Sequence, residues 1–148
     1  MEENVQESGY DALKLDNQLC FPLYAAARKV VSLYTPHFKE IGITYTQYIV
    51  FLVLWEHESV TVGELCQKLY LDSGTVTPML KKLETEGYIT RERSIDDERV
   101  VFVSLTEKGA RLKEKAKNIP AAVGACVPLT PDEAAAMYGL LYKLLGKI

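Results

Sequence analysis

Residues 64–109 read ELCQKLYLDSGTVTPMLKKLETEGYITRERSIDDERVVFVSLTEKG, and this stretch decides the fold. Its first helical run leads to a turn, after which Asp72 and Ser73 open a second helix, because both residue types cap helix N-termini. Two runs rich in β-branched residues follow at 88–92 and 100–105, and they are typical of a two-stranded ribbon. The order of helix, turn, helix and hairpin predicts a winged helix-turn-helix, a module that binds duplex DNA.

The segments on the N-terminal side of this stretch are helical by pattern. Apolar residues recur at three- and four-residue spacing from Asp16, which predicts a helix that kinks or restarts at Pro36 and ends before Gly42. A nearly continuous apolar run predicts a buried helix over 46–57. The residues expected to cap helix N-termini along the chain are Asp16 or Asn17, Thr44 or Thr46, Thr61, Asp72 or Ser73, Thr106 and Thr130.

On the C-terminal side, Thr106 starts a long helix that Pro120 breaks or bends, and Pro128 interrupts the chain again before a last helix to about Leu145. The expected fold class is mainly α with a small β-hairpin wing. We expect one domain, 1–148, in which residues 44–105 form the DNA-binding module.

Composition supports a folded intracellular protein. The chain has 148 residues of which 48% are hydrophobic, enough for a packed core. It has no apolar run of the roughly 20 residues that span a bilayer, and its acidic start resembles neither a signal nor a transit peptide. We therefore expect a cytoplasmic protein without a membrane partner. The three cysteines, an odd count with no CxxC pair, favour neither a structural disulfide framework nor a zinc site, and no cofactor is expected.

A net charge of −3 does not exclude DNA binding, because affinity depends on where cations and helix N-termini lie. The cations of the module are Lys81, Lys82, Arg91, Arg93 and Arg99. Short polar side chains at the start of the second helix of the module would face base edges and phosphates, and lysines further along would reach phosphates. The predicted DNA-facing residues of this helix are Asp72, Ser73, Thr75, Thr77, Lys81 and Lys82. The opposite, core-facing side is expected to carry Leu71, Val76, Met79, Leu80 and Leu83.

At the hairpin tip, Arg99 is placed to enter a minor groove, and Asp97 could orient its guanidinium. Two plainer interpretations remain open. The tip could be a charge-balanced hairpin in solvent, and the helix could be an ordinary surface helix.

These residues support a family resemblance. Residues 44–115 resemble the MarR family of dimeric winged-helix regulators, above all in the run DDERVVFVSLTEKG. The resemblance implies a homodimer formed by the terminal helices, here 12–42 and 106–148, that binds a near-palindromic double-stranded operator.

The N-terminal run LKLDNQLCFPLYAAAR, residues 13–28, is similar to the OhrR branch, the organic hydroperoxide resistance regulators. ITYTQYIVFLVLWEHE and LYLDSGTVTPMLK match the same branch. The resemblance implies that Cys20 senses peroxide and that Tyr34 and Tyr45 hydrogen-bond to it across the dimer.

The chemistry of sensing fits these residue types. A thiol with an ordinary pKa near 8.5 is only roughly 3% ionised at pH 7, and the thiolate is the species that attacks a peroxide. A helix N-terminus contributes up to about 1 kcal/mol to thiolate stability, and two phenolic donors would add more. The aromatic residues expected to line the pocket are Phe21, Tyr24, Tyr34, Tyr45 and Trp55. The plainer interpretation of Cys20 is a small core residue.

The other two cysteines differ. Cys66 is interpreted as structural, because it lies beside the apolar face of a short helix. Cys126 follows the run IPAAVGA, which resembles the region of the resolving cysteine in two-cysteine members, so an interchain disulfide with Cys20 is expected. A small cellular thiol could instead resolve oxidised Cys20, and Cys126 would then be a small buried residue among alanines.

The sequence thus predicts a redox-sensing repressor, not an enzyme, that leaves its operator when an organic hydroperoxide oxidises Cys20. One alternative is a repressor released by a phenolic or aromatic ligand, with Cys20 incidental. A second is a thiol peroxidase, which the absence of a CxxC or thioredoxin-like pattern disfavours. A third is a DNA-bridging protein without a ligand.

Overall fold

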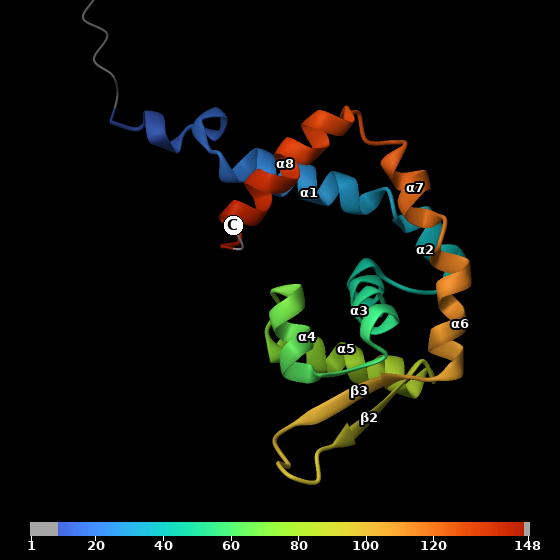
Figure 1. Cartoon of the computed structure of the whole chain (residues 1–148). Helices are drawn as coiled ribbons and strands as arrows, with labels where there is room; N and C mark the ends of the chain where they lie inside the picture. Colours follow the sequence, from blue (N-terminus) through green and yellow to red (C-terminus); the bar gives the residue numbers. More distant parts are fainter. Residues whose placement is uncertain (1–8, 147–148) are drawn as a thin grey trace, which may run out of the picture.

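The structure, a computed structural model, describes residues 9–146 and is mostly helical with one small sheet (Figure 1). The predicted DNA-binding module, called the reading module from here on, consists of α3 (Tyr45–His57), β1 (Ser59–Thr61), α4 (Val62–Leu69), α5 (Ser73–Thr85), β2 (Ile89–Arg93) and β3 (Val101–Leu105). The three strands are antiparallel in the order β1-β3-β2. The winged helix-turn-helix predicted from the sequence is therefore confirmed.

The core of the molecule is centred on this module and extends beyond it to Phe38, Leu112, Ala116, Ile119 and Val123. Helix α3 is apolar on nearly all sides and buries Val50, Phe51 and Leu54 completely. The core-facing side predicted for α5 is also confirmed, because Val76, Leu80 and Leu83 are fully buried, and Leu71 and Met79 pack against the core while partly exposed. The tight packing of these side chains holds α4, α5 and the sheet in one body.

Five helix starts follow the expected caps, whereas the cap predicted at Asp16 or Asn17 is wrong, because α1 (Cys20–Ser32) follows Leu19, which makes no side-chain cap hydrogen bond. Thr44, Thr61 and Thr130 each accept a hydrogen bond from the third residue of their helix, and the Gln or Glu at that position bonds back to the cap. Asp72 and Thr106 cap α5 and α6 in the same way without the reciprocal bond. These bonds satisfy backbone N–H groups that a helix N-terminus leaves unpaired.

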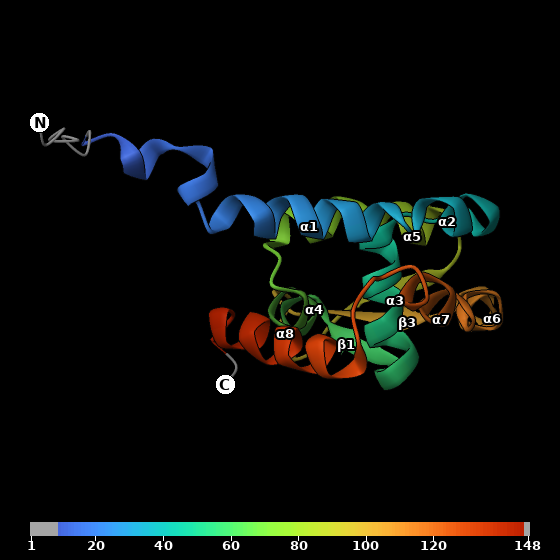
Figure 2. The ribbon, with the colours of Figure 1, turned by 90° about the horizontal axis from the view of Figure 1, so that it is seen from above.

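The flanking helices are α1 (Cys20–Ser32), α2 (Thr35–Ile41), α6 (Glu107–Ala116), α7 (Ile119–Gly124) and α8 (Pro131–Leu144). Neither α1 nor α8 contains a buried residue. Viewed from above, they run along opposite sides of the molecule (Figure 2). None of the helices in residues 9–146 is long and apolar enough to cross a membrane.

Many large apolar side chains of these terminal elements are exposed. On the N-terminal side they are Leu13, Leu15, Leu19, Phe21, Leu23, Tyr24 and Val30, and on the C-terminal side Met137, Tyr138, Leu140, Leu144 and Leu145. So many exposed large apolar side chains on two helices favour an interface with another chain.

Three details differ from the sequence prediction. The first long helix begins at Cys20 and not near Asp16, because Gln18 is extended and two short 3-10 turns, η1 (Asp11–Leu13) and η2 (Leu15–Asn17), precede it. This helix ends at Ser32, so the break comes before Pro36, which sits in the first turn of α2. Strand β1 is additional, since the pattern predicted only a two-stranded ribbon.

Candidate nucleic-acid interface and redox site

The start of α5 presents short polar side chains to solvent. Ser73 and Thr75 are exposed and Thr77 is half-buried. Asp72 accepts hydrogen bonds from the backbone N–H of Thr75, at 2.8 Å, and from its hydroxyl, at 3.1 Å. These bonds hold the pKa of Asp72 below its usual value. Asp72 is therefore a charged cap that fixes the first turn of the helix, and its role toward bases stays a prediction.

The lysines further along the helix are exposed as well. Lys81 lies in solvent, and Lys82 approaches Glu86 at 3.9 Å. At this distance and exposure the pair contributes little, so the ammonium of Lys82 remains available to a phosphate. The structure thus places all six DNA-facing residues predicted on α5 along one helix, with five of them exposed.

The wing tip is held by a compact set of hydrogen bonds. Arg99 donates to both carboxylate oxygens of Asp97, from Nε at 3.1 Å and from an amino nitrogen at 3.2 Å. These bonds lower the pKa of Asp97, while the Arg99 side chain remains 90% exposed. Ser94 accepts from the N–H groups of Asp96 and Asp97, and Arg93 donates to the carbonyl of Glu98 at 2.9 Å. The tip therefore presents an oriented guanidinium to solvent.

Between the wing and the helix N-termini lies a hollow of about 620 Å³. Ser73 and Thr77 line it from α5, and Arg91 and Arg99 line it from the wing. Cys66 also faces this hollow while packing against the core. Its interpretation as a structural cysteine stays a prediction.

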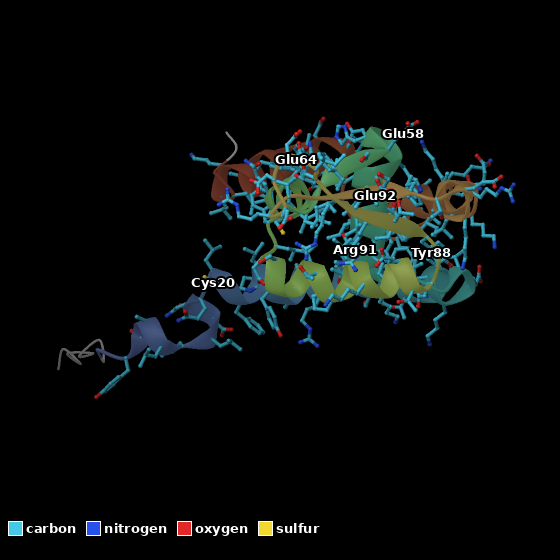
Figure 3. All side chains as sticks on the ribbon, turned by 90° about the horizontal axis from the view of Figure 1, so that it is seen from below. Cys20, Glu58, Glu64, Tyr88, Arg91 and Glu92 are labelled. Atoms are coloured by element: carbon cyan, nitrogen blue, oxygen red, sulfur yellow. The ribbon has the colours of Figure 1, made fainter. Side chains whose placement is uncertain are left out.

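Cys20 is the first residue of α1 and is exposed. Figure 3 shows it where the N-terminal 3-10 turns join the body of the molecule. Tyr24 follows one turn later and Arg28 two turns later, on the same helix face. The Arg28 guanidinium lies over the Tyr24 ring, 5.3 Å from its centroid. Phe21 is 43% exposed beside Cys20 in the sequence.

Tyr34 and Tyr45 belong to an aromatic cluster with Phe38 and Tyr48. The rings of Tyr34 and Tyr45 meet edge to face at 5.1 Å, and those of Phe38 and Tyr48 lie 5.0 Å apart. Burial raises the pKa of Tyr45, and the neighbouring phenol of Tyr34 raises it further. The Tyr45 hydroxyl is therefore protonated at neutral pH and can donate a hydrogen bond. Tyr48 was not singled out from the sequence, although its spacing of three from Tyr45 puts both on one face of α3.

Within one chain these tyrosines do not meet Cys20. The whole of α1, 13 residues, separates Cys20 from Tyr34, a helix length of about 20 Å. Trp55 has another partner, since its indole N–H donates to the carbonyl of Gly109 at 3.0 Å and its ring stacks on Phe51. The contact of tyrosines with Cys20 across a dimer stays a prediction, and so does a pocket that includes Trp55.

Cys126 follows α7 in a turn and is exposed in the single chain, not buried among the neighbouring alanines. Its thiol lies 3.5 Å from the carbonyl of Ala122. Figure 1 shows α7, which ends two residues before Cys126, on the side of the molecule where α2 lies, whereas Cys20 is the first residue of α1 and lies at its other end (Figure 3). Residues 9–146 contain no group of His, Cys, Asp and Glu side chains that could hold a metal ion.

Comparison with known proteins agrees with this architecture. The family model described as "Transcriptional regulator SarA/Rot" matches residues 32–116. The organic hydroperoxide resistance transcriptional regulator of Bacillus subtilis (strain 168) is 49% identical over 139 residues, which cover 94% of this chain and 95% of the relative.

Two solved structures of AbfR, a Staphylococcus epidermidis protein, are also similar. The reduced form bound to DNA gives a TM-score of 0.76 at 36% identity, covering 90% of this chain and 94% of that chain. The form described as "Disulfide formed AbfR" gives 0.64 at 36% identity, covering 90% and 93%.

The chain therefore belongs to the SarA/Rot family of transcriptional regulators, within the wider MarR group that includes the organic hydroperoxide resistance regulators. Its relatives are regulators and not enzymes.

Proposed function

We propose that this protein is a redox-sensing repressor whose dimer binds a near-palindromic operator when reduced and leaves it when an organic hydroperoxide oxidises Cys20. The observation that carries the proposal is the position of Cys20, an exposed thiol at the first residue of α1, in a chain 49% identical to an organic hydroperoxide resistance regulator. At this position the sulfur lies at the positive end of the helix dipole, beside backbone N–H groups of the first turn that have no partner within the helix.

DNA binding is proposed for the face that carries α5 and the wing. Each subunit would insert the start of α5 into a major groove, with Thr75 and Thr77 near base edges, and would place Arg99 in the adjacent minor groove. The reduced and the overoxidised DNA-bound forms of AbfR give TM-scores of 0.76 and 0.74 with this structure, and the disulfide form gives 0.64, which supports a DNA-binding arrangement of the subunit.

The dimer is proposed to form through the terminal helices. Neither α1 nor α8 buries a residue in the single chain, and both carry large exposed apolar side chains. Covering this surface with a second copy would remove it from water and would bring a partner to the exposed Cys20. The phenols of Tyr34 and Tyr45 are proposed to reach the Cys20 thiolate of the other subunit, where hydrogen bonds to a charged sulfur stabilise it.

The oxidation step is an attack of the Cys20 thiolate on the peroxide. The new S–O bond forms as the O–O bond breaks, and the alkoxide that leaves takes a proton to become an alcohol. Cysteine is oxidised by two electrons to the sulfenic acid and the hydroperoxide is reduced. The thiolate of Cys126 from the other subunit then attacks this sulfur, forming the S–S bond and releasing hydroxide, which is protonated to water.

The disulfide would drive release from DNA by moving backbone. A disulfide requires the two Cα atoms to approach within about 7 Å. In one chain the two cysteines lie on elements at opposite ends of the molecule, which favours a bond between subunits over one within a subunit. Joining α1 of one subunit to the segment after α7 of the other would shift the terminal helices and, with them, the separation of the two reading heads.

The test compares wild type with Cys20→Ser on operator DNA before and after addition of cumene hydroperoxide. Wild type should leave the DNA and Cys20→Ser should stay bound. If Cys20→Ser is released equally, the sensor assignment is wrong. Non-reducing electrophoresis of wild type and Cys126→Ser then tests the bridge: a cross-linked dimer in wild type alone supports Cys126 as the resolving residue, and its absence assigns resolution to a small thiol.

A further inference from the structure

The carboxylate of one residue, Glu84, connects α5 to the wing through hydrogen bonds. Glu84, in the last turn of α5, accepts three hydrogen bonds from Arg91 in the middle of β2. The backbone N–H of Arg91 donates to Oε1 at 3.2 Å, and the side chain donates to Oε2 from Nε at 3.0 Å and from an amino nitrogen at 2.7 Å. Figure 3 shows Arg91 between the β2 ribbon and α5.

This pair differs from the other ion pairs of the module. Its side chains are only 22% and 36% exposed, whereas Arg99 in its pair with Asp97 is 90% exposed, and it joins two different elements, α5 and β2. A bidentate guanidinium fixes direction as well as distance, which a lysine ammonium does not. The Lys82 ammonium, by contrast, is 63% exposed and lies 3.9 Å from its partner.

We propose that Glu84 and Arg91 are positioning residues for operator binding: together they fix the wing relative to α5, so that Arg99 reaches the minor groove, and Arg91 itself does not contact DNA. This inference rests on the proposed function as an operator-binding protein. It reassigns Arg91, which from the sequence counts among the cations of the reading module.

The paired strands of the wing extend beyond this ion pair, so a small rotation at Arg91 becomes a larger displacement at the wing tip. Arg91 pairs with Val103 in the β-ladder, and β2 and β3 remain paired to Arg93 and Val101. The tip is then braced by the bond from Arg93 to the carbonyl of Glu98. Arg99 lies four residues from Val103, roughly 13 Å along an extended chain. A tilt of about 10° at Arg91 would move Arg99 by about 2 Å, enough to break hydrogen bonds that tolerate a few tenths of an ångström.

The direction in which Glu84→Gln changes DNA affinity distinguishes two roles of Arg91, phosphate binding and positioning of the wing. If Arg91 bound a phosphate, Glu84→Gln would remove a competing negative charge and strengthen DNA binding, most of all at low salt. If the pair positions the wing, Glu84→Gln should weaken binding about threefold and Glu84→Ala about tenfold, the range in which coupled residues act. Arg91→Lys should weaken binding too, because a lysine keeps the charge but loses the bidentate contact.

The experiment measures fluorescence anisotropy on a duplex that wild type has selected from a random-sequence library. The matched control is Glu114→Gln on α6, which removes the same charge from an exposed pair with Lys117, the residue that follows this helix. Thermal unfolding followed by circular dichroism shows that each variant is folded. The deciding measurement is the double variant with Arg99→Ala, in which Glu84→Ala should have little further effect.

Each outcome decides. Weaker binding by the Glu84 variants that disappears in the Arg99→Ala background supports the positioning role. Binding equal to or tighter than the Glu114→Gln control overturns it, and so does an equal loss with and without Arg99, which would indicate general damage to the module. If wild type selects no duplex, the proposed function fails as well. If wild type binds and is released by hydroperoxide while Glu84→Ala binds normally, only the present inference fails.

Discussion

The reading module and the terminal helices are built by different means. The module encloses its own core, and side chains such as Leu54, Leu65 and Leu80 are fully buried in a single chain. Helices α1 and α8 are equally regular, with α8 even carrying a full capping box, yet neither buries a residue. A helix of this length is marginal in water without tertiary packing. The difference teaches that the reading module is packed within one copy, whereas α1 and α8 have no packed core of their own in a single chain.

The largest expected effect is in the module. Leu54→Ala should lower the free energy of unfolding by about 3 kcal/mol, because it removes buried atoms and leaves a cavity. Leu144, which is 66% exposed on α8, provides the contrasting site. Urea unfolding of both alanine variants at low protein concentration, where subunits separate, measures the effect. A similar loss for Leu144→Ala would show that α8 packs on its own chain.

Next in size is the effect of separating the subunits. Leu140→Glu places a charge on the exposed apolar face of α8, whose leucine is 64% exposed in the single chain. Sedimentation should show monomers with an intact far-ultraviolet spectrum. Affinity for a two-half-site operator should fall about 100-fold, because the second head no longer binds at a high effective concentration. Dimers that persist in this variant would exclude α8 from the interface.

A smaller effect on stability is expected when either of two similar N-caps is removed, and it should differ between them. Thr61 and Thr130 each begin a helix with a capping box, on α4 and α8 respectively. Thr61→Ala should lower global stability by about 1 kcal/mol, since α4 packs in the core. Thr130→Ala should instead speed hydrogen exchange within α8 and leave the unfolding midpoint of dissociated subunits unchanged. Equal midpoint shifts in the two variants would contradict the separation of the regions.

The smallest expected effect is on stability at acidic pH. Hydrogen bonds from the backbone and hydroxyl of Thr61 and of Thr130 lower the pKa values of Glu64 and Glu133 below 4.5. A carboxylate with a lowered pKa in the folded state contributes stability that is fully present above 4.5 and is lost as pH falls through the lower, folded value. Glu64→Gln should therefore flatten the fall in urea midpoint between pH 5 and 3, and Glu133→Gln should not. Parallel curves for all three proteins would refute this.

What the sequence predicted follows the same division. The caps at Thr44, Thr61 and Asp72 were predictable because a cap and the N–H groups it binds lie within three residues. Strand β1 was not, because its three residues are defined by pairing with β3, more than forty residues later. The start of the first helix was placed too early because apolar spacing continues through a segment in which Gln18 is extended.

The candidate site shows the same limit. The bond between Asp97 and Arg99 was predictable since the residues are two apart. The pair of Glu84 and Arg91 was missed, because it depends on how α5 packs against β2. The surroundings of Cys20 are the extreme case. Its expected partners, Tyr34 and Tyr45, lie beyond the far end of α1 in their own chain, so no local pattern places them near the thiol.

Gly109, in the first turn of α6, approaches the backbone of the module closely. A Cβ atom at this position would lie 2.2 Å from the carbonyl oxygen of Tyr88, and the carbonyl of Gly109 itself binds Trp55. At this junction α6 therefore packs against the reading module with no room for a further side-chain atom. Extra residues should be tolerated in the turn after α7, whereas even one added methyl group at Gly109 should force α6 away from Tyr88 and so disturb how the C-terminal helices are attached to the reading module.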